Sequence, residues 1–315
     1  MYVCHSSVRR KNTLDRLAHL TTFLAIAESG GLAAAGRRLG RSPPAMSRAL
    51  AELEASLGTR LAERSTRRFA LTDAGRRLAE QARQALGELE DALRDAAGEG
   101  REARGRLRIA APLVFGRRHV APIVAAFLDA HPAVSVDLIL SDRVAELVEE
   151  GIDVAIRIGR LPDSTLRARR LGAVRRILVA SPAYLARRGS PAGPEALAGH
   201  ELIVFASQAA PAEWRFSRLG GAPMVLRPEA RFAVNEAEAA VAAAVEGRGI
   251  LQSLSYQSAA EVASGRLVRL LREAEPPPIP VQLVFPEGRF MPARLRAFLD
   301  EAAPRLAALP VLGEA

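Results

Sequence analysis

Cysteine, lysine and aromatic residues are scarce in this sequence. Cys4 is the one cysteine, so no internal disulfide can form, and it makes no metal-binding cluster with the five scattered histidines. Lys11 is the one lysine, so arginine supplies nearly all of the positive charge. The shortage of cysteine fits a reducing, cytoplasmic setting, and neither a metal nor a cofactor is expected.

Long apolar runs are absent as well. The chain has no uninterrupted apolar stretch of about 18 residues, the length that a membrane-spanning helix needs. Residues 1–13 also lack the apolar core of a secretory signal. We therefore expect a cytoplasmic protein with no membrane partner. Residues 1–13 are expected to be an extension before the first domain, or the product of a start codon placed too early.

The motifs of common enzyme classes are also missing. The chain contains no nucleophile elbow, no phosphate-binding loop, no zinc-binding H-E-x-x-H segment and no cysteine partnered by a histidine. We therefore expect no catalytic residues and no enzymatic activity.

Positive charge is concentrated at the start of the chain. The 315 residues are 49% hydrophobic, which is enough for two or three folding units. Residues 1–75 hold 12 basic and 6 acidic residues, and so carry +6 of the net charge of +9. This asymmetry favours a polyanionic partner such as DNA. The alternative explanation for this positive charge is a general preference for arginine throughout the chain.

Three helices are predicted in this basic region. Apolar residues recur at steps of three and four over 14–29 and 32–39, and glycines follow both segments. Ser42 is a suitable N-cap for a third helix that continues to Leu57, with two prolines in its first turn. The candidate DNA-binding residues at the start of this helix are Arg41, Ser42, Pro43, Pro44, Ser47 and Arg48. The alternative is a capped helix start that simply faces solvent.

A basic hairpin and a long helix are predicted next. Residues 61–71 are interpreted as two short strands around a tip, which would follow backbone phosphates as a wing through Arg64, Thr66, Arg67 and Arg68. A solvated turn is the alternative. A long helix is predicted over 72–98, and the apolar residues at 71, 74, 78, 82, 85, 89, 92 and 96 predict a coiled-coil seam. We expect this helix to pair with a copy of itself and not with a core.

From Gly105 the pattern alternates between strands and helices, which predicts an open α/β sheet. The first set comprises strands over 107–111, 134–140 and 152–158 and helices over 116–130 and 144–150. The second set has strands over 173–180, 202–205 and 250–254 and a helix that opens at Asn235. A strand over 281–285 and a helix over 292–309 are expected to return to the first lobe. Hinges near 160–165 and 265–280 would leave a cleft between two lobes, a natural ligand site.

Two sets of motifs extend over nearly the whole chain. The first set lies in residues 23–39, 42–54, 57–61 and 71–75, where serine, proline, serine and arginine precede a later Leu-Thr-Asp-Ala-Gly segment. The second set lies in residues 105–109, 153–159, 181–185 and 247–250. At these spacings the sequence closely resembles the LysR-type transcription regulators of bacteria.

The resemblance implies an α/β fold with a winged helix-turn-helix over 14–71, a linker and dimerisation helix over 72–98, and an effector domain over 105–315. The effector domain would be two-lobed, like a periplasmic binding protein, with lobe 1 at about 105–162 and 267–315 and lobe 2 at about 163–266. Such a regulator binds double-stranded promoter DNA as a homodimer or dimer of dimers and senses a small molecule between its lobes. RNA polymerase is a candidate further partner.

Two departures from the family pattern affect the DNA-binding region. Pro43 stands where the family usually has a glutamine, and proline offers no side-chain donor to a base edge, so sequence readout would depend more on Ser47, Arg48 and DNA shape. Ala62 stands where an aromatic residue is common, and we interpret this as a packing change.

The candidate effector-binding residues lie at the expected cleft. Many relatives have a hydroxyl where this chain has Ala111, but amides at the helix start near Leu113 could still hold a carboxylate. The full set is Ala111, Leu113, Arg157, Phe205, Asn235 and Glu236. As alternatives, Phe205 would be a core residue, Arg157 would pair with an acid of its own lobe, and Asn235 would cap its helix.

Other functions are kept as alternatives. The missing hydroxyl near Ala111 is compatible with a DNA-binding regulator that has no functional ligand site. Two hinged lobes also describe a solute-binding protein or an α/β enzyme, but neither class explains a basic helix-turn-helix on a coiled-coil stalk.

Overall fold

The computed structural model describes residues 5–64, 69–96, 102–143, 146–147, 149–161, 166–205, 212–217, 223–287 and 291–313. The chain forms two compact units, which we call the helical unit, residues 1–101 together with 149–151, and the two-lobed unit, residues 102–148 and 152–315. Each unit has its own buried core. The α/β fold class with an N-terminal helix-turn-helix is confirmed.

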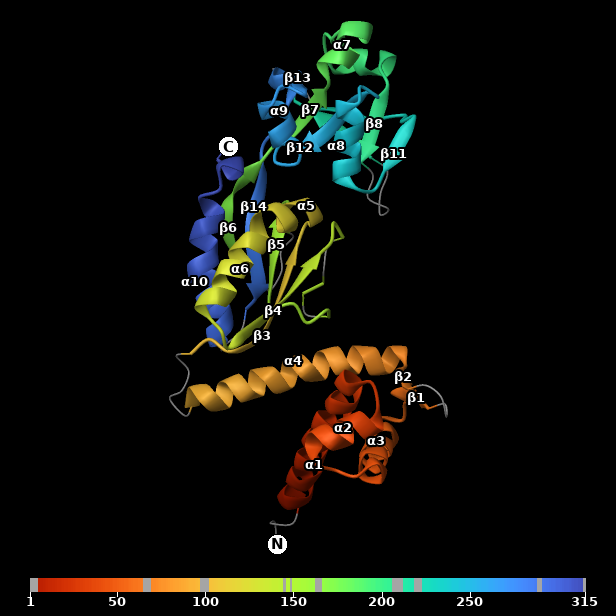
Figure 1. Cartoon of the computed structure of the whole chain (residues 1–315), viewed down its shortest axis with the longest axis vertical. Helices are drawn as coiled ribbons and strands as arrows, with labels where there is room; N and C mark the ends of the chain where they lie inside the picture. Colours follow the sequence, from red (N-terminus) through yellow and green to blue (C-terminus); the bar gives the residue numbers. More distant parts are fainter. Residues whose placement is uncertain are drawn as a thin grey trace. The chain divides into compact units, whose positions relative to one another are not determined.

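The helical unit contains the three predicted helices, the predicted hairpin and the long helix (Figure 1). The first helix begins at His5, earlier than the expected start at Leu14. The two strands pair antiparallel, as expected. In chain order the elements are α1 (His5–Ser29), α2 (Leu32–Leu39), α3 (Pro43–Leu57), β1 (Ala62–Arg64), β2 (Phe69–Leu71) and α4 (Asp73–Ala96).

The core of the helical unit includes the first half of α4, which corrects the expectation that this helix stays out of a core. Leu78, Ala79, Ala82 and Leu86 pack with the apolar side chains of α1 and α3. Further along α4, Leu89 is 42% exposed. The expected seam therefore has two parts, one buried within the unit and one that faces solvent.

A hydrogen-bonded corner fixes the start of α4. The Thr72 hydroxyl accepts a hydrogen bond from the Gly75 amide at 3.0 Å and donates one to the Arg60 carbonyl at 2.8 Å. The Thr72 amide donates to the Leu61 carbonyl at 3.0 Å. The chain passes so close that a Cβ on Gly75 would lie 2.0 Å from that carbonyl oxygen. Only glycine fits this position without a backbone shift.

Two glycines of α4 provide a matched test of this corner. Gly75→Ala should lower the free energy of unfolding of the helical unit by about 1–3 kcal/mol, because the new methyl group overpacks the corner. Gly87→Ala should raise it by about 0.5–1 kcal/mol, since Gly87 has open space around its Cβ position and alanine favours helix. Urea unfolding of the full chain, followed by circular dichroism, measures both. Equal effects of the two substitutions would contradict the close approach at Gly75.

The first lobe of the two-lobed unit is a five-stranded sheet with the order β4-β3-β5-β14-β6. Strands β3, β4 and β5 are parallel, whereas β14 runs antiparallel to its neighbours β5 and β6. The last strand, β14, lies within this sheet, and the last helix packs on it. The strands are β3 (Gly105–Ala111), β4 (Val134–Leu140), β5 (Val154–Ile158), β6 (Leu166–Val174) and β14 (Ile279–Pro286).

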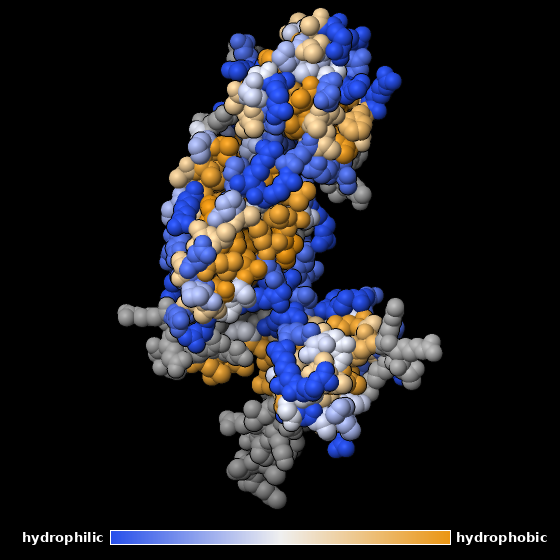
Figure 2. All heavy atoms as spheres, in the orientation of Figure 1, coloured by the Kyte–Doolittle hydropathy of each residue, from blue (hydrophilic) through white to orange (hydrophobic). Residues whose placement is uncertain are grey.

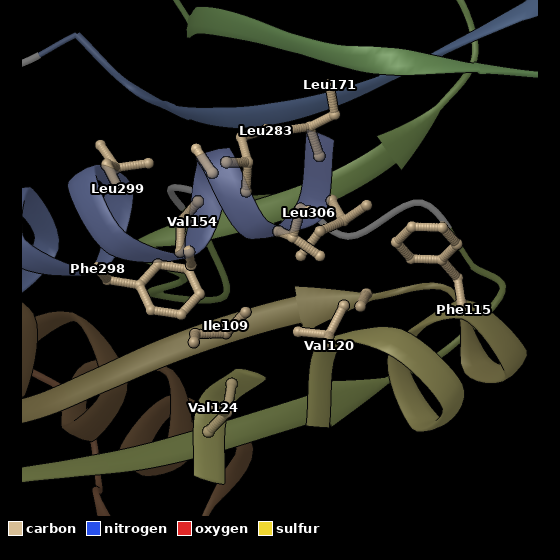
Figure 3. Close-up of a cluster of buried hydrophobic side chains, with 14 of the residues drawn as sticks. Ile109, Phe115, Val120, Val124, Val154, Leu171, Leu283, Phe298, Leu299 and Leu306 are labelled. Carbon is tan, nitrogen blue, oxygen red and sulfur yellow. The ribbon is translucent and has the colours of Figure 1, made fainter. Parts of the chain in front are cut away.

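Helices cover one face of this sheet. The segments that do so are α5 (Leu113–Phe115), a π-helical turn η1 (Gly116–Val120), α6 (Ala121–Ala130), α10 (Ala293–Ala307) and a 3-10 turn η4 (Pro310–Leu312). Helices α6 and α10 lie side by side (Figure 1), and their apolar side chains meet those of the sheet in one core (Figure 3). In that core Phe298 of α10 lies among Ile109, Val124 and Val154. Apolar surface on the first lobe is visible in Figure 2.

The helix expected over 144–150 is not found in the described part of that segment. Residues 147 and 149–151 form turns and 146 has no regular structure, whereas 144, 145 and 148 lie outside the described residues. The Ile152 amide donates to the Leu147 carbonyl at 2.8 Å, and both side chains are buried against the sheet face opposite the helices. A tight turn therefore buries Leu147, the described apolar residue of the segment for which a helix was expected.

The first hinge was misplaced from the sequence. The strand expected over 173–180 is two strands, with Arg175 between them, and its first part belongs to β6 of the first lobe. Arginines obscured β6 in the sequence because an edge strand tolerates charge, while Leu171 and Val174 still reach the core. The first crossing between the sheets therefore lies at Arg175. The second lies between Leu270 and Ile279, within the expected range, so residues 268–270 stay with the second lobe.

The second lobe has a five-stranded sheet with the order β11-β8-β12-β7-β13 and a separate hairpin of β9 and β10. Its strands are β7 (Arg176–Ala180), β8 (Leu202–Phe205), β9 (Trp214–Phe216), β10 (Met224–Leu226), β11 (Phe232–Val234), β12 (Ile250–Leu254) and β13 (Val268–Leu270). Its helical segments are α7 (Pro182–Arg188), η2 (Pro194–Gly199), α8 (Ala237–Val245), α9 (Ala259–Ala263) and η3 (Arg272–Ala274). Helix α8 packs on one face of the sheet, and α7 with the hairpin packs on the other.

No single helix in the described part of the chain is long and apolar enough to cross a membrane. Helix α2 and residues 16–29 of α1 meet such a criterion only as a pair bent by 120°. Their apolar side chains, among them Phe23, Ile26 and Ala35, form the core of the helical unit.

Candidate DNA interface and lobe junction

The turn between α2 and α3 brings the predicted DNA-binding residues to one end of a helix. Gly40 adopts a left-handed conformation with φ of 62°, and the Arg41 amide donates to the Gly36 carbonyl at 2.9 Å, which closes α2. The Ser42 hydroxyl then accepts from the Ala45 amide at 3.4 Å and caps α3, as expected from the sequence. The chain therefore reverses tightly between the two helices.

The start of α3 is open to solvent. Ser42, Pro43, Pro44 and Arg48 are exposed, and Ser47 is half-buried. Arg41 is also exposed and donates to the Thr22 hydroxyl of α1 at 3.3 Å. The opposite side of α3 is buried through Met46, Leu50 and Leu53. A helix N-terminus with its partial positive charge, small residues and the exposed Arg48 can approach phosphates and base edges without burying an apolar surface.

An ion-pair network links the three helices that hold α3 in place. Glu28 of α1 accepts from Arg38 of α2 at 2.7 Å and lies 3.4 Å from Arg83 of α4. Burial raises the pKa of Glu28, but the hydrogen bonds from Arg38 and Arg83 outweigh burial and hold this pKa below its ordinary value. The carboxylate therefore stays charged and connects α2 to the linker helix.

The wing is anchored by a residue that the sequence analysis missed. One Glu54 oxygen accepts hydrogen bonds from the amides of Leu61 and Ala62, at 2.8 and 3.2 Å, just where β1 begins. The only sequence clue was an acidic residue next to the buried Leu53 of α3. The candidates Thr66, Arg67 and Arg68 lie outside the described residues, and of Arg64 only the backbone, in β1, is described.

Removing the Glu54 carboxylate should loosen the wing. Glu54→Ala leaves two backbone amides without their acceptor and should lower the free energy of unfolding by about 1–3 kcal/mol. Glu54→Gln retains an acceptor oxygen and should keep most of that stability. Chemical unfolding followed by circular dichroism measures these changes. Glu52→Ala, which removes an exposed ion pair with His19 of α1, is the control and should change stability by less than about 1 kcal/mol; a similar loss for both alanine variants would argue against the anchor.

The end of β3 and the start of α5 already hold an internal carboxylate. Ala111 is 3% exposed and its side chain belongs to the core of the first lobe. The amide of Leu113, which we expected to be available to a carboxylate, donates to an oxygen of Asp142 at 3.1 Å. This helix start therefore does bind a carboxylate, but one that belongs to the chain itself.

The two lobes share apolar contacts beside this point. Phe205 of β8 is half-buried and packs against the cores of both lobes, and Ala237 and Tyr256 of the second lobe join the core of the first. The Tyr256 ring meets Phe115 edge-on with centroids 5.3 Å apart. Burial, and then the nearby charge of Asp142, raises the pKa of Tyr256, so its hydroxyl stays protonated.

A polar contact bridges the lobes next to these rings. Arg117 and Arg118 of η1 both bind the carboxylate of Glu238 in α8, Arg117 through one oxygen and Arg118 through the other at 3.0 Å. Arg118 also donates to the Gln257 carbonyl at 3.3 Å. We call Arg117, Arg118 and Glu238 the lobe clamp. Sequence analysis missed it because its partners are 120 residues apart and form no motif.

His119 follows directly on the two arginines of the lobe clamp. Its ring is 5.0 Å from that of Phe115, centroid to centroid. Burial, and then the charge of Arg118, lowers the pKa of His119, so the neutral imidazole is favoured. Its Nε2 atom is buried and has no hydrogen-bond partner in the described part of the chain.

The remaining effector candidates do not gather at one point. Glu236, and not Asn235, caps α8: its carboxylate accepts from the amides of Glu238 and Ala239 at 3.0 and 2.7 Å. Asn235 is exposed. Arg157 lies in β5 opposite Gln282 of β14, and strand alternation turns it away from the core that holds Ile156.

A metal centre is not indicated at either site. Among the residues that the structure describes, no three His, Cys, Asp or Glu side chains gather in a way that could hold a metal ion.

These features define the class of the protein as a winged helix-turn-helix protein with a two-lobed α/β ligand-binding domain. Residues 17–76 match the model of the bacterial regulatory helix-turn-helix proteins of the lysR family, and residues 100–307 match the LysR substrate binding domain. The chain therefore belongs to the LysR family of bacterial transcription regulators. It is a DNA-binding regulator with an effector-binding domain.

Relatives of similar length support this assignment. The HTH-type transcriptional regulator PtxR of Pseudomonas aeruginosa is 37% identical over 305 residues, which is 97% of each chain. The solved structure of AphB, a virulence activator of Vibrio cholerae, is 28% identical with a TM-score of 0.60 over 91% of this chain and 98% of that one. CrgA of Neisseria meningitidis is 30% identical with a TM-score of 0.59 over 92% and 98%.

Proposed function

We propose that this regulator binds double-stranded promoter DNA through the exposed start of α3, and that the two-lobed unit adjusts this binding when a small molecule enters between its lobes. The observation that carries the proposal is the solvent-open helix start with Ser42, Ser47 and Arg48. Residues 14–71 are the proposed DNA-binding domain, 72–98 the linker and 105–315 the effector domain. Such a protein acts in the cytoplasm, without enzymatic activity and with RNA polymerase as a further candidate partner.

Sequence readout is assigned mainly to Arg48. Pro43 has no side-chain donor, and Ser42 uses its hydroxyl to cap α3, so neither can replace a base-reading amide. Arg48 is exposed one turn into the helix, where a guanidinium can bind a guanine edge with two hydrogen bonds. Arg64, Thr66, Arg67 and Arg68 are the proposed phosphate contacts of the wing.

The test is a fluorescence-anisotropy titration with the DNA upstream of the protein's own gene, at two salt concentrations and beside unrelated DNA. Arg48→Ala should cost about 1–3 kcal/mol of binding to the upstream fragment and relax the preference for one base pair. Arg266→Ala, which removes an exposed arginine of the second lobe, is the control and should leave binding unchanged. An equal loss of affinity for both DNAs would make Arg48 a phosphate contact instead.

We also propose that the chain works as a homodimer, or as a dimer of dimers, through the second half of α4. Leu89 and Leu93 are 42% and 62% exposed and lie four residues apart on one side of the helix. Large apolar residues in such a row are typical of a coiled-coil contact. Two-fold symmetry would then place two α3 helices on half-sites about one helical turn of DNA apart, or a multiple of it.

Charge on this row should break the dimer. The double variant Leu89→Glu and Leu93→Glu brings four carboxylates together in a dimer, so it should sediment with a lower mass than the unchanged chain in analytical ultracentrifugation. Arg77→Glu, at an exposed site in the first half of α4, changes charge without touching the row and should keep the assembly. An unchanged mass for the double variant would exclude this row as the contact.

A further inference from the structure

The lobe clamp is a contact between lobes in which positive charge exceeds negative charge. Two guanidinium groups converge on the single carboxylate of Glu238, one on each oxygen. Glu238 and Arg118 are 29% and 30% exposed, so neither is fully hydrated. Without Glu238, the partly buried Arg118 and the more exposed Arg117, at 53%, would be neighbouring cations that have lost their shared carboxylate, which is unfavourable unless another anion takes its place.

The carboxylate of Glu238 is not needed to complete α8. The amides at the start of this helix are capped by Glu236, which binds those of Glu238 and Ala239. The Glu238 side chain therefore contributes to the lobe contact and leaves the helix intact when it moves. A carboxylate held only by side chains can be exchanged for one that comes from solution.

The surroundings of the clamp suit an organic anion. His119 directly follows the two arginines, and its buried Nε2 has no hydrogen-bond partner in the described part of the chain. Its ring packs on Phe115, which is buried against Tyr256 in the core of the first lobe. The two cations are therefore adjoined by a polar group without a partner and by buried apolar side chains, a combination that is typical of small-molecule sites.

We propose that Glu238 stands in for the effector's anionic group: it occupies Arg117 and Arg118 when no effector is present, and a small carboxylate displaces it on binding. The inference rests on the proposed function, because it assumes a ligand between the lobes. The displaced group is planar, with one oxygen for each guanidinium, so a carboxylate reproduces its geometry better than a tetrahedral anion does. The clamp thereby selects the chemical class of the effector and couples its binding to the contact between lobes.

Displacement makes Glu238 an internal competitor. The affinity for a carboxylate is reduced by the fraction of molecules in which Glu238 occupies the arginines. Removing the negative charge at position 238 should therefore strengthen carboxylate binding, whereas a purely structural ion pair would give weaker binding or none when it is broken. The sign of this change separates the two roles.

The experiment is isothermal titration of the full chain with benzoate, with benzamide as the uncharged analogue and inorganic phosphate as the tetrahedral anion. Glu238→Gln should bind benzoate about tenfold more tightly than the unchanged chain does, with benzamide binding unaltered. Glu238→Ser is a second variant with the same expected gain, and thermal unfolding verifies that both are folded. Arg118→Met keeps the apolar stem and should lose benzoate binding.

Glu246→Gln is the matched control, because it removes a carboxylate at the other end of α8, outside the clamp, and should match the unchanged chain. The proposal is overturned if the variants at 238 bind benzoate no better than the unchanged chain, if no chain binds it, or if phosphate binds more tightly. DNA titrations with the same preparations test the proposed function separately. A chain that prefers the upstream fragment but does not bind carboxylates would overturn this inference and leave the proposed DNA binding intact.

Discussion

The two-lobed unit depends on one topological constraint, the insertion of β14 between β5 and β6. The first sheet is incomplete until the chain has left it at Arg175, built the whole second lobe and returned at Ile279. Both crossings therefore lie close together, and the Ser255 amide and hydroxyl bind the backbone of Arg175 at 2.8 and 3.2 Å. The two lobes are joined at these crossings, and η1 of the first lobe contacts α8 of the second although the two segments are far apart in sequence.

Carboxylates of the chain itself bind the backbone amides and arginine side chains at this junction that could hold an anion. Asp142 binds the amide at the start of α5, Glu236 binds those at the start of α8, and Glu238 binds the arginines of η1. Burying an unpaired donor or cation would be costly, so a junction without ligand needs such partners. Two of these acids complete helix ends and are structural. Glu238 is different, because its partners are arginine side chains from the opposite lobe and not backbone amides.

Sequence reasoning succeeded where the determining interactions are local. Ser42 caps α3 through a residue three positions away, and the periodicity of α1 to α4 reflects contacts within one or two turns. It failed where partners are distant: β6 looked too charged for a strand because its pairing with β14 is not visible in the sequence, and a tight turn at 149–151 replaced a helix. The bounds and the N-cap of α3 were therefore predictable from the sequence, whereas the lobe clamp was not.

Helix α4 is anchored in the core of the helical unit by its first part and exposes apolar residues on its second part. Because Leu78, Ala82 and Leu86 are fixed in the core that also holds α3, the direction of α4 is set relative to the recognition helix. The ion pairs of Glu28 with Arg38 and Arg83 reinforce the same geometry. A partner that packs on the exposed row at Leu89 and Leu93 therefore cannot turn without turning α3 as well. In the proposed dimer, the spacing between the two α3 helices would then depend on how the two α4 helices meet, so a small change in that contact would alter which DNA half-sites the dimer fits.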